Sequence, residues 1–132
     1  MKKILIVEDQ DDARKMISMA LGRTSYQLLE AANGAEALKA ARDHTPEVVI
    51  LDVKMPGSIN GFQVCEMIKT DAELSKTFVI LASGLNDSKD FAEARRVGAN
   101  AYLVKPFRLA RLVEIIVNHA ELTDNFILEM NR

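Results

Sequence analysis

The sequence predicts an α/β domain in which five parallel strands form one open, doubly wound sheet with five helices covering its two faces. Five short apolar runs recur along the 132 residues, and segments whose apolar residues have helical spacing separate them. Such alternation is typical of right-handed parallel βαβ units. The length suits one domain with a substantial core, and no internal repeat or linker divides it.

The first two predicted strands are residues 4–7 (ILIV) and 26–31 (YQLLEA), of which the second has the weaker pattern. Between them a helix over 11–22 begins at Asp11 as N-cap and stops at Gly22, with apolar positions at Ala13, Met16, Ile17, Ala20 and Leu21. A second helix follows the turn at Asn33-Gly34, carries Ala37, Leu38 and Ala41, and ends at His44-Thr45-Pro46.

The second half of the chain repeats this alternation. Strands are predicted over 48–51 (VVIL), 78–82 (FVILA) and 101–104 (AYLV). Helices are predicted near 61–70 and near 87–97, the latter ending at Gly98. A last helix begins near 107 and has one apolar face, formed by Leu109, Leu112, Val113, Ile116, Val117 and Ala120.

The composition excludes several classes of protein. A hydrophobic fraction of 48% with 27% charged residues is typical of a globular protein, and the net charge of −2 gives no reason to expect direct nucleic-acid binding. A single cysteine, Cys65, excludes an internal disulfide and fits a reducing cytoplasm. No apolar run is long enough to insert into a membrane, and the start MKKILIVED is a strand rather than a signal peptide.

Polar side chains follow four of the predicted strands at the points where these strands end. Glu8 and Asp9 follow the first, Asp52 the third, Ser83 the fourth and Lys105 the fifth. In doubly wound folds the carboxyl ends of the strands form the ligand site. Crowded carboxylates repel unless a cation intervenes, and Mg²⁺ prefers such oxygen ligands. We therefore expect Asp52 to be a phosphoryl acceptor at a Mg²⁺ site, with Lys105 and Ser83 on the other phosphoryl oxygens.

The segments ILIVEDQ, AANGAEAL, VVILDVKMPG, ILAS and GANAYLVKPF, in this order and spacing, resemble receiver domains of two-component response regulators, the family that includes the chemotaxis Y protein. The resemblance implies a flavodoxin-like sheet of order 2-1-3-4-5 and phosphorylation on Asp52. It implies a phosphorylation-dependent switch rather than an enzyme, although the domain catalyses its own phosphoryl transfer and slow autodephosphorylation. A sensor histidine kinase or a histidine phosphotransfer protein would be the donor, and a downstream protein the target.

The resemblance also implies individual roles. Asp9, Asp52 and the carbonyl of Lys54 would bind Mg²⁺ directly, and Glu8 would act through water. Ser83 would be the switch hydroxyl and would move toward the phosphate, and Tyr102 would be the switch aromatic that turns inward. The Lys105–Pro106 peptide would be cis.

Three departures from the family pattern lie near the site. The segment MPGSINGFQV is one residue longer than usual between Pro56 and Gly61 and lacks the usual acid before this glycine. Ser83 replaces the commoner threonine, and Glu8 replaces the commoner aspartate.

Two other function classes are weighed against this interpretation. A phosphatase of the haloacid dehalogenase type also uses a strand-end aspartate, but it needs a second aspartate at the position of Lys54. A receiver that only binds partners without phosphorylation typically lacks the acidic pair, the acceptor or the lysine, all of which this chain keeps. Mg²⁺ binding and labelling by acetyl phosphate separate this second class from a phosphorylated receiver.

The chain is divided into a receiver domain over residues 1–121 and a C-terminal tail over 122–132. The spacing of Leu122, Phe126 and Met130 would give an apolar stripe if the tail continued the last helix; the other expectation is a tail that is frayed or folded back on the core. On the extended helix this stripe would pack against a partner or a second copy of the chain, and the second case would give a dimer linked to phosphorylation. Asn100 and Ala101 replace acids of one large subfamily, so charge pairs with Arg95, Arg96, Arg108 and Arg111 would be incomplete.

Overall fold

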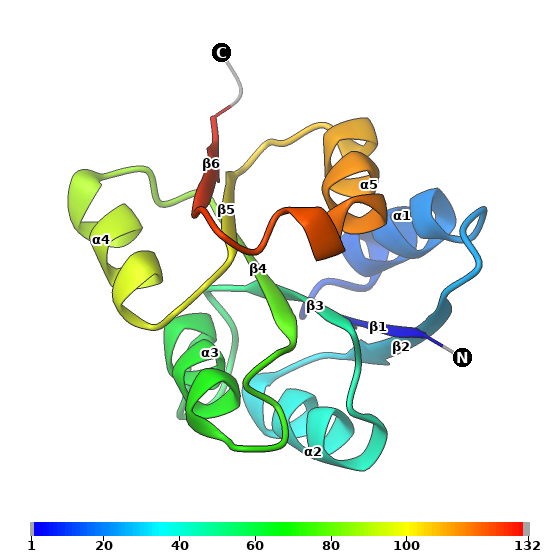
Figure 1. Cartoon of the computed structure of the whole chain (residues 1–132), viewed down its shortest axis with the longest axis horizontal. Coiled ribbons are helices and arrows are strands. Elements are labelled where there is room, and N and C mark those ends of the chain that lie inside the picture. Colours follow the sequence, from blue (N-terminus) through cyan, green and yellow to red (C-terminus); the bar gives the residue numbers. More distant parts are fainter. Residues whose placement is uncertain (1, 131–132) are drawn as a thin grey trace.

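The computed structural model describes residues 2–130 and has one parallel sheet flanked by helices on both faces (Figure 1). The sheet order is β2-β1-β3-β4-β5-β6, so the predicted order 2-1-3-4-5 is present but the predicted number of five strands is wrong. The strands are β1 (Lys3–Val7), β2 (Gln27–Ala31), β3 (Val48–Asp52), β4 (Phe78–Ser83), β5 (Ala101–Val104) and β6 (Ile127–Glu129).

The five predicted helices all form. Helices α1 and α5 lie on one face of the sheet, and α2, α3 and α4 lie on the other (Figure 1). Their bounds are α1 (Asp11–Leu21), α2 (Gly34–His44), α3 (Gly61–Thr70), α4 (Ser88–Arg96) and α5 (Leu109–Val117). The longest described helices have 11 residues, fewer than the roughly 18–20 that a membrane crossing requires.

Alternating strand residues build two separate hydrophobic cores. Leu5, Val49 and Leu81 point toward α2, α3 and α4, whereas Ile4 and Ile50 point toward α1 and α5. The central strands are buried on both faces, which explains why their sequences are continuous apolar runs. The two cores hold the sheet rigid, so the strand ends that carry the candidate site are fixed relative to one another.

Helix α1 uses fewer of its apolar positions than predicted. Ile17 and Leu21 are buried, but 58% of Met16 and 78% of Met19 are exposed. Helix α1 packs against β1, β2 and α5, and the side chains of Met16 and Met19 lie outside this contact. Helix spacing alone therefore placed Met16 wrongly in the core.

The predicted continuation of the last helix is wrong for the described residues. Helix α5 ends at Val117, whose side chain is 57% exposed, and a 3₁₀ turn over His119–Glu121 follows. The chain then turns back, and β6 pairs in parallel with β5. Consequently no helical stripe of Leu122, Phe126 and Met130 exists, and the tail instead extends the sheet by one strand.

Candidate functional site

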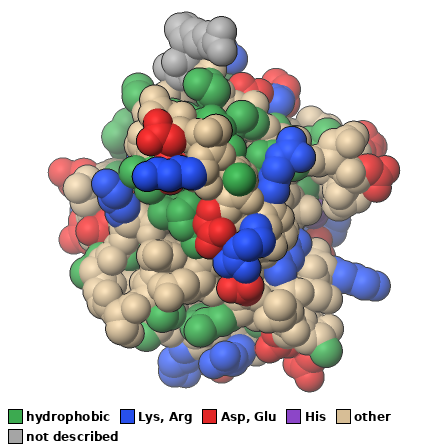
Figure 2. Space-filling model, turned by 90° about the vertical axis from the view of Figure 1, so that its left-hand side faces the viewer, with side chains coloured by type: hydrophobic (Ala, Val, Ile, Leu, Met, Phe, Trp, Pro, Cys, Tyr) green, Lys and Arg blue, Asp and Glu red, His purple; other side chains and the backbone are tan. Residues whose placement is uncertain are grey.

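The predicted site residues meet at the carboxyl ends of the strands. Glu8 and Asp9 follow β1, and Asp52 is the last residue of β3, which neighbours β1 in the sheet. Because these strands are parallel, their carboxyl ends share one edge of the sheet. Figure 2 looks onto this edge, where acidic side chains near the middle of the face lie beside basic ones.

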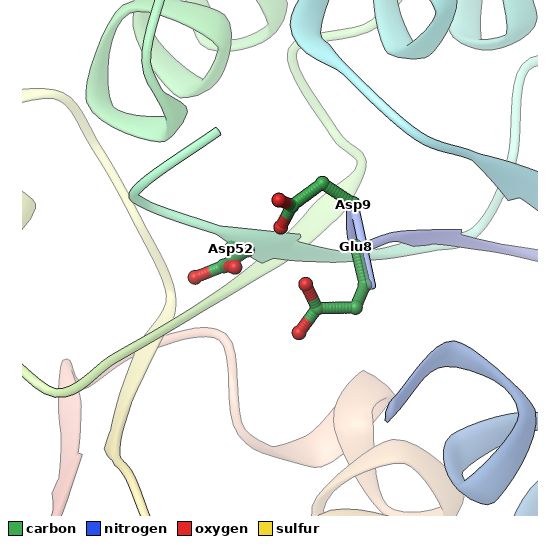
Figure 3. Close-up of side chains that lie close together, drawn as sticks. All are labelled: Glu8, Asp9 and Asp52. Atoms are coloured by element: carbon green, nitrogen blue, oxygen red, sulfur yellow. The ribbon is translucent and has the colours of Figure 1, made fainter. Parts of the chain in front are cut away.

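Three carboxylates form the acidic cluster, which consists of Glu8, Asp9 and Asp52 (Figure 3). One oxygen of each lies within 4.8 Å of the others, and all three side chains extend beyond the strand ends. Glu8 and Asp52 are buried, whereas Asp9 is exposed. An all-oxygen set that is open on one side suits Mg²⁺, which keeps several waters and takes one or two carboxylates. The residues present therefore fit a magnesium ion.

Lys105 bridges the two buried carboxylates of this cluster. Its Nζ lies 3.0 Å from Oε1 of Glu8 and 3.3 Å from Oδ1 of Asp52. Burial alone would lower the pKa of Lys105, but the hydrogen bond to Glu8 and the negative charges of Asp52 and Glu8 outweigh burial and raise this pKa. Lys105 is therefore held as an ammonium directly beside the candidate acceptor.

Burial and the neighbouring carboxylates also shift the acids. Burial raises the pKa of Asp52 to about 6; the Lys105 ammonium opposes this shift, and the Glu8 charge adds to it. Proximity to Glu8 raises the pKa of Asp9. Burial would raise the pKa of Glu8, but hydrogen bonds with Asp9, Lys105 and the Gln10 amide lower it overall. A divalent cation would relieve this crowding.

Ser83 and Tyr102 are connected through the segment that follows β4. The Ser83 hydroxyl oxygen accepts a hydrogen bond from the Leu85 amide at 3.1 Å, and the Tyr102 hydroxyl donates to the Leu85 carbonyl at 2.7 Å. The Tyr102 side chain is fully buried, so the ring is already inward in this structure. Ser83 follows Ala82, which is the register partner of Asp52. The Ser83 carbonyl accepts a hydrogen bond from the Lys105 amide at 2.8 Å.

The longer segment between β3 and α3 has a defined conformation. Asn60 and Gln63 form a capping box at the start of α3, with hydrogen bonds of 3.0 and 2.8 Å. Asn60 thus occupies the place of the usual acid and satisfies the helix terminus. A Cβ on Gly61 would overlap the Asp52 carbonyl oxygen and lie 2.7 Å from the Val53 Cα. Only glycine lets α3 approach the end of β3 this closely.

Arg14 was missed from the sequence, the role of the Lys54 carbonyl remains a prediction, and the cis peptide before Pro106 is present. Arg14 on α1 donates to the Glu8 carbonyl at 2.7 Å and pairs with Glu30 and Asp11, so it fixes the turn that carries the acidic pair. Nothing in the local sequence around Arg14 indicated that its side chain would reach the backbone of Glu8. Lys54 has an exposed side chain in the segment after β3, and its carbonyl as a metal ligand remains a prediction. The Lys105–Pro106 peptide is cis, as the resemblance implies.

An open, doubly wound domain with an acidic cluster and a lysine at the carboxyl ends of its strands is the arrangement expected of the class of receiver domains. Comparison with known proteins supports this class. The family described as the response regulator receiver domain matches residues 4–117. The chain therefore belongs to the receiver domains of two-component response regulators.

Individual relatives agree with this assignment. The protein PilH of Pseudomonas aeruginosa is 35% identical over 116 residues, which cover 88% of this chain and 95% of PilH. The crystallised chemotaxis protein CheY4 of Vibrio cholerae is 30% identical with a TM-score of 0.82, and the match covers 89% of this chain and 98% of CheY4.

A longer relative shows that the same unit also occurs as part of a larger protein. The transcriptional regulatory protein AfsQ1 of Streptomyces coelicolor is 36% identical over 106 residues, covering 80% of this chain but only 45% of AfsQ1. This chain thus spans less than half the length of AfsQ1. What the remainder of AfsQ1 does therefore does not carry over to this chain.

Proposed function

We propose that this chain is a phosphorylation-dependent switch in which Asp52 accepts a phosphoryl group from a phosphohistidine. The observation that carries the proposal is the placement of Lys105 within 3.3 Å of a buried Asp52 whose neighbours are two further carboxylates. A structural salt bridge would need neither the third carboxylate nor the opening to solvent at Asp9. The donor would be a sensor histidine kinase or a histidine phosphotransfer protein.

The chemistry is a phosphoryl transfer between two side chains. A carboxylate oxygen of Asp52 attacks the phosphorus, and the bond from phosphorus to the histidine nitrogen breaks. The electron pair of that bond stays on the imidazole, which then takes up a proton. Lys105 donates to one phosphoryl oxygen, and Ser83 can donate to another because its hydroxyl proton is not used by the Leu85 amide.

Glu8, Asp9 and Asp52, with the Lys54 carbonyl, would hold Mg²⁺, Glu8 acting through a water molecule. When bound, the ion neutralises the crowded carboxylates and the oxygens of the incoming phosphoryl group. Glu8 is oriented for this role by the Gln10 amide, which donates to its Oε2 at 3.2 Å. The domain catalyses only its own phosphorylation and a slow autodephosphorylation, so it is a signalling switch rather than an enzyme with a separate substrate.

A surface next to the site suits the protein donor. A groove between α1 and the segment after β5 is lined by Met16, Phe107 and Leu109 and reaches Glu8 and Lys105. Met19 extends the apolar surface along α1, where 78% of its side chain is exposed. Exposed methionines adapt to varied partner surfaces. A donor whose histidine reaches Asp52 would cover this groove. We place the switch in the cytoplasm, where ATP is available to such a donor.

The test is Mg²⁺-dependent labelling with acetyl phosphate followed by intact-mass measurement. We expect one added phosphoryl group on the unaltered protein, none after chelation of Mg²⁺, and none on Asp52→Asn. Asp12→Asn, which removes an exposed acid on α1, is the matched control and should label normally. Full labelling of Asp52→Asn would refute the assignment. A protein that is not labelled and does not bind Mg²⁺ would instead be a receiver that only binds partners.

A further inference from the structure

The tail strand β6 lies along β5, between α4 and α5 (Figure 1). The Ile127 amide donates to the Asn100 carbonyl at 3.0 Å, and three register pairs continue the ladder. Asn100 is itself fixed, because its side chain accepts from the Val79 amide at 2.9 Å. The tail therefore covers the edge of β5, which would otherwise be the last strand of the sheet.

Side chains of the tail also bind the two neighbouring helices. The guanidinium of Arg95 on α4 lies over the Phe126 ring, 4.8 Å from its centroid. On the other side, Nε of Arg111 on α5 lies 2.7 Å from Oε1 of Glu129. Arg95 and Arg111, two of the four arginines expected to serve charge pairing between copies, thus have partners within the chain. The tail joins α4, β5 and α5 into one unit.

The tail lies directly beside the switch aromatic. Leu128 is the register partner of Tyr102, and partners in a parallel pair place their side chains on the same face of the sheet. The Tyr102 ring packs edge-on against Phe91 of α4, with 5.4 Å between centroids. If the ring turned outward, toward the edge of β5, it would meet the space that Leu128 occupies. Docking of β6 therefore confines Tyr102 to its buried position.

Tyr102 in turn connects the tail to the phosphoryl-acceptor site. Its hydroxyl holds the Leu85 carbonyl, and the Leu85 amide donates to the Ser83 hydroxyl oxygen. In this arrangement the Ser83 oxygen accepts from the Leu85 amide, a bond that does not use the hydroxyl proton, so this proton can be donated to a phosphoryl oxygen. The buried position of Tyr102 is therefore compatible with a phosphoryl group on Asp52. With Tyr102 buried, the Ser83 hydroxyl is oriented to donate to that phosphoryl group.

From this chain of contacts we propose that docking of β6 on β5 is positively coupled to occupation of the Asp52 site by a phosphoryl group. The inference rests on the proposed phosphorylation of Asp52 and adds a positioning element, the tail strand, that the family match over residues 4–117 does not include. Because coupling between two sites is reciprocal, a phosphoryl group also stabilises the docked tail. Phosphorylation of Asp52 would then change how firmly the tail is docked on the face formed by α4, β5 and α5.

The first test uses full-length variants and beryllofluoride as the phosphoryl probe, with Mg²⁺ in excess. Ile127→Pro removes the amide that donates to Asn100, and Leu128→Ala removes the side chain beside Tyr102. Met130→Ala is the matched control, because Met130 is 38% exposed against 40% for Leu128 but lies beyond the strand. We expect beryllofluoride to bind Ile127→Pro at least about fivefold more weakly and Leu128→Ala also more weakly, with no change for Met130→Ala.

Two further measurements separate coupling from a general loss of structure. Mg²⁺ alone should bind all variants equally, since the acidic cluster does not contact β6. In the unaltered protein, beryllofluoride should slow hydrogen exchange of the Ile127 amide at least about fivefold. This measurement decides the question even if Ile127→Pro does not fold.

The outcomes are distinguishable. Equal beryllofluoride binding by the unaltered protein and a folded Ile127→Pro, or faster exchange of Ile127 in its presence, would overturn the coupling and leave the proposed function standing. Failure of the unaltered protein to bind beryllofluoride would overturn both.

Discussion

Replacement of Asp52 by asparagine should stabilise the folded protein at neutral pH, although it removes the proposed acceptor. Asp52 is only 7% exposed, and burial raises its pKa from the ordinary value of 3.8 to about 6. Between about pH 3.8 and 6 the folded state therefore holds a proton on Asp52 that the unfolded state has released, and at neutral pH the carboxylate is ionised in both states. Each pKa unit corresponds to about 1.4 kcal/mol, so the ionised carboxylate costs at most about 3 kcal/mol of folding free energy.

The pH dependence follows from the direction of this shift. Well below pH 3.8 the carboxyl is neutral in both states, and at pH 4 Asp52→Asn should have only a small effect. As the pH rises through the range between 3.8 and about 6, the unaltered protein loses stability relative to Asp52→Asn, and above this range the difference stays constant. Allowing for residual solvent contact, we expect Asp52→Asn to be more stable by about 1–3 kcal/mol at pH 8.

Urea unfolding followed by circular dichroism at pH 4 and pH 8, without divalent cations, measures this difference. Glu73→Gln, which neutralises an exposed acid far from the site, is the control and should change stability by less than about 0.5 kcal/mol at either pH. Adding Mg²⁺ should stabilise the unaltered protein more than Asp52→Asn and so narrow the gap. Equal stability of the two proteins at pH 8, or an equally large gap at pH 4, would refute the reasoning.

Three other predictions concern the segments around Asp52. Gly61→Ala should destabilise the protein by about 1–3 kcal/mol in urea unfolding, because its Cβ would overlap the Asp52 carbonyl; an unchanged midpoint would contradict this close approach. Asn60→Ala should cost about 1 kcal/mol in the same assay through loss of the α3 cap, and a neutral result would mean that water replaces it. The double variant Lys54→Asn/Leu85→Glu should lose its phosphoryl group faster in a mass-based decay assay, because neither original side chain positions water well; slower or equal decay would contradict shielding.

Much of the site could be predicted because it depends on a local pattern and one general rule. Glu8, Asp52 and Lys105 each follow an apolar run, and parallel strands bring their carboxyl ends together. The capping residue Asn60 was missed, but the pairing of Asn60 with Gln63 three residues later is a signal that could have found it. Arg14 could not be found in this way, since its contact with the Glu8 carbonyl depends on how α1 leaves the strand.

The sequence alone determined the first five strands, the five helices and the strand-end acids, because apolar periodicity is a local property of a few neighbouring residues. Tertiary structure decided the fate of the tail. Spacing at 122, 126 and 130 favoured a helix. In the structure the edge of β5 instead pairs with residues 127–129, and Arg95 and Arg111 contact Phe126 and Glu129. These contacts join distant parts of the chain, and a three-residue strand carries too little local preference to reveal them.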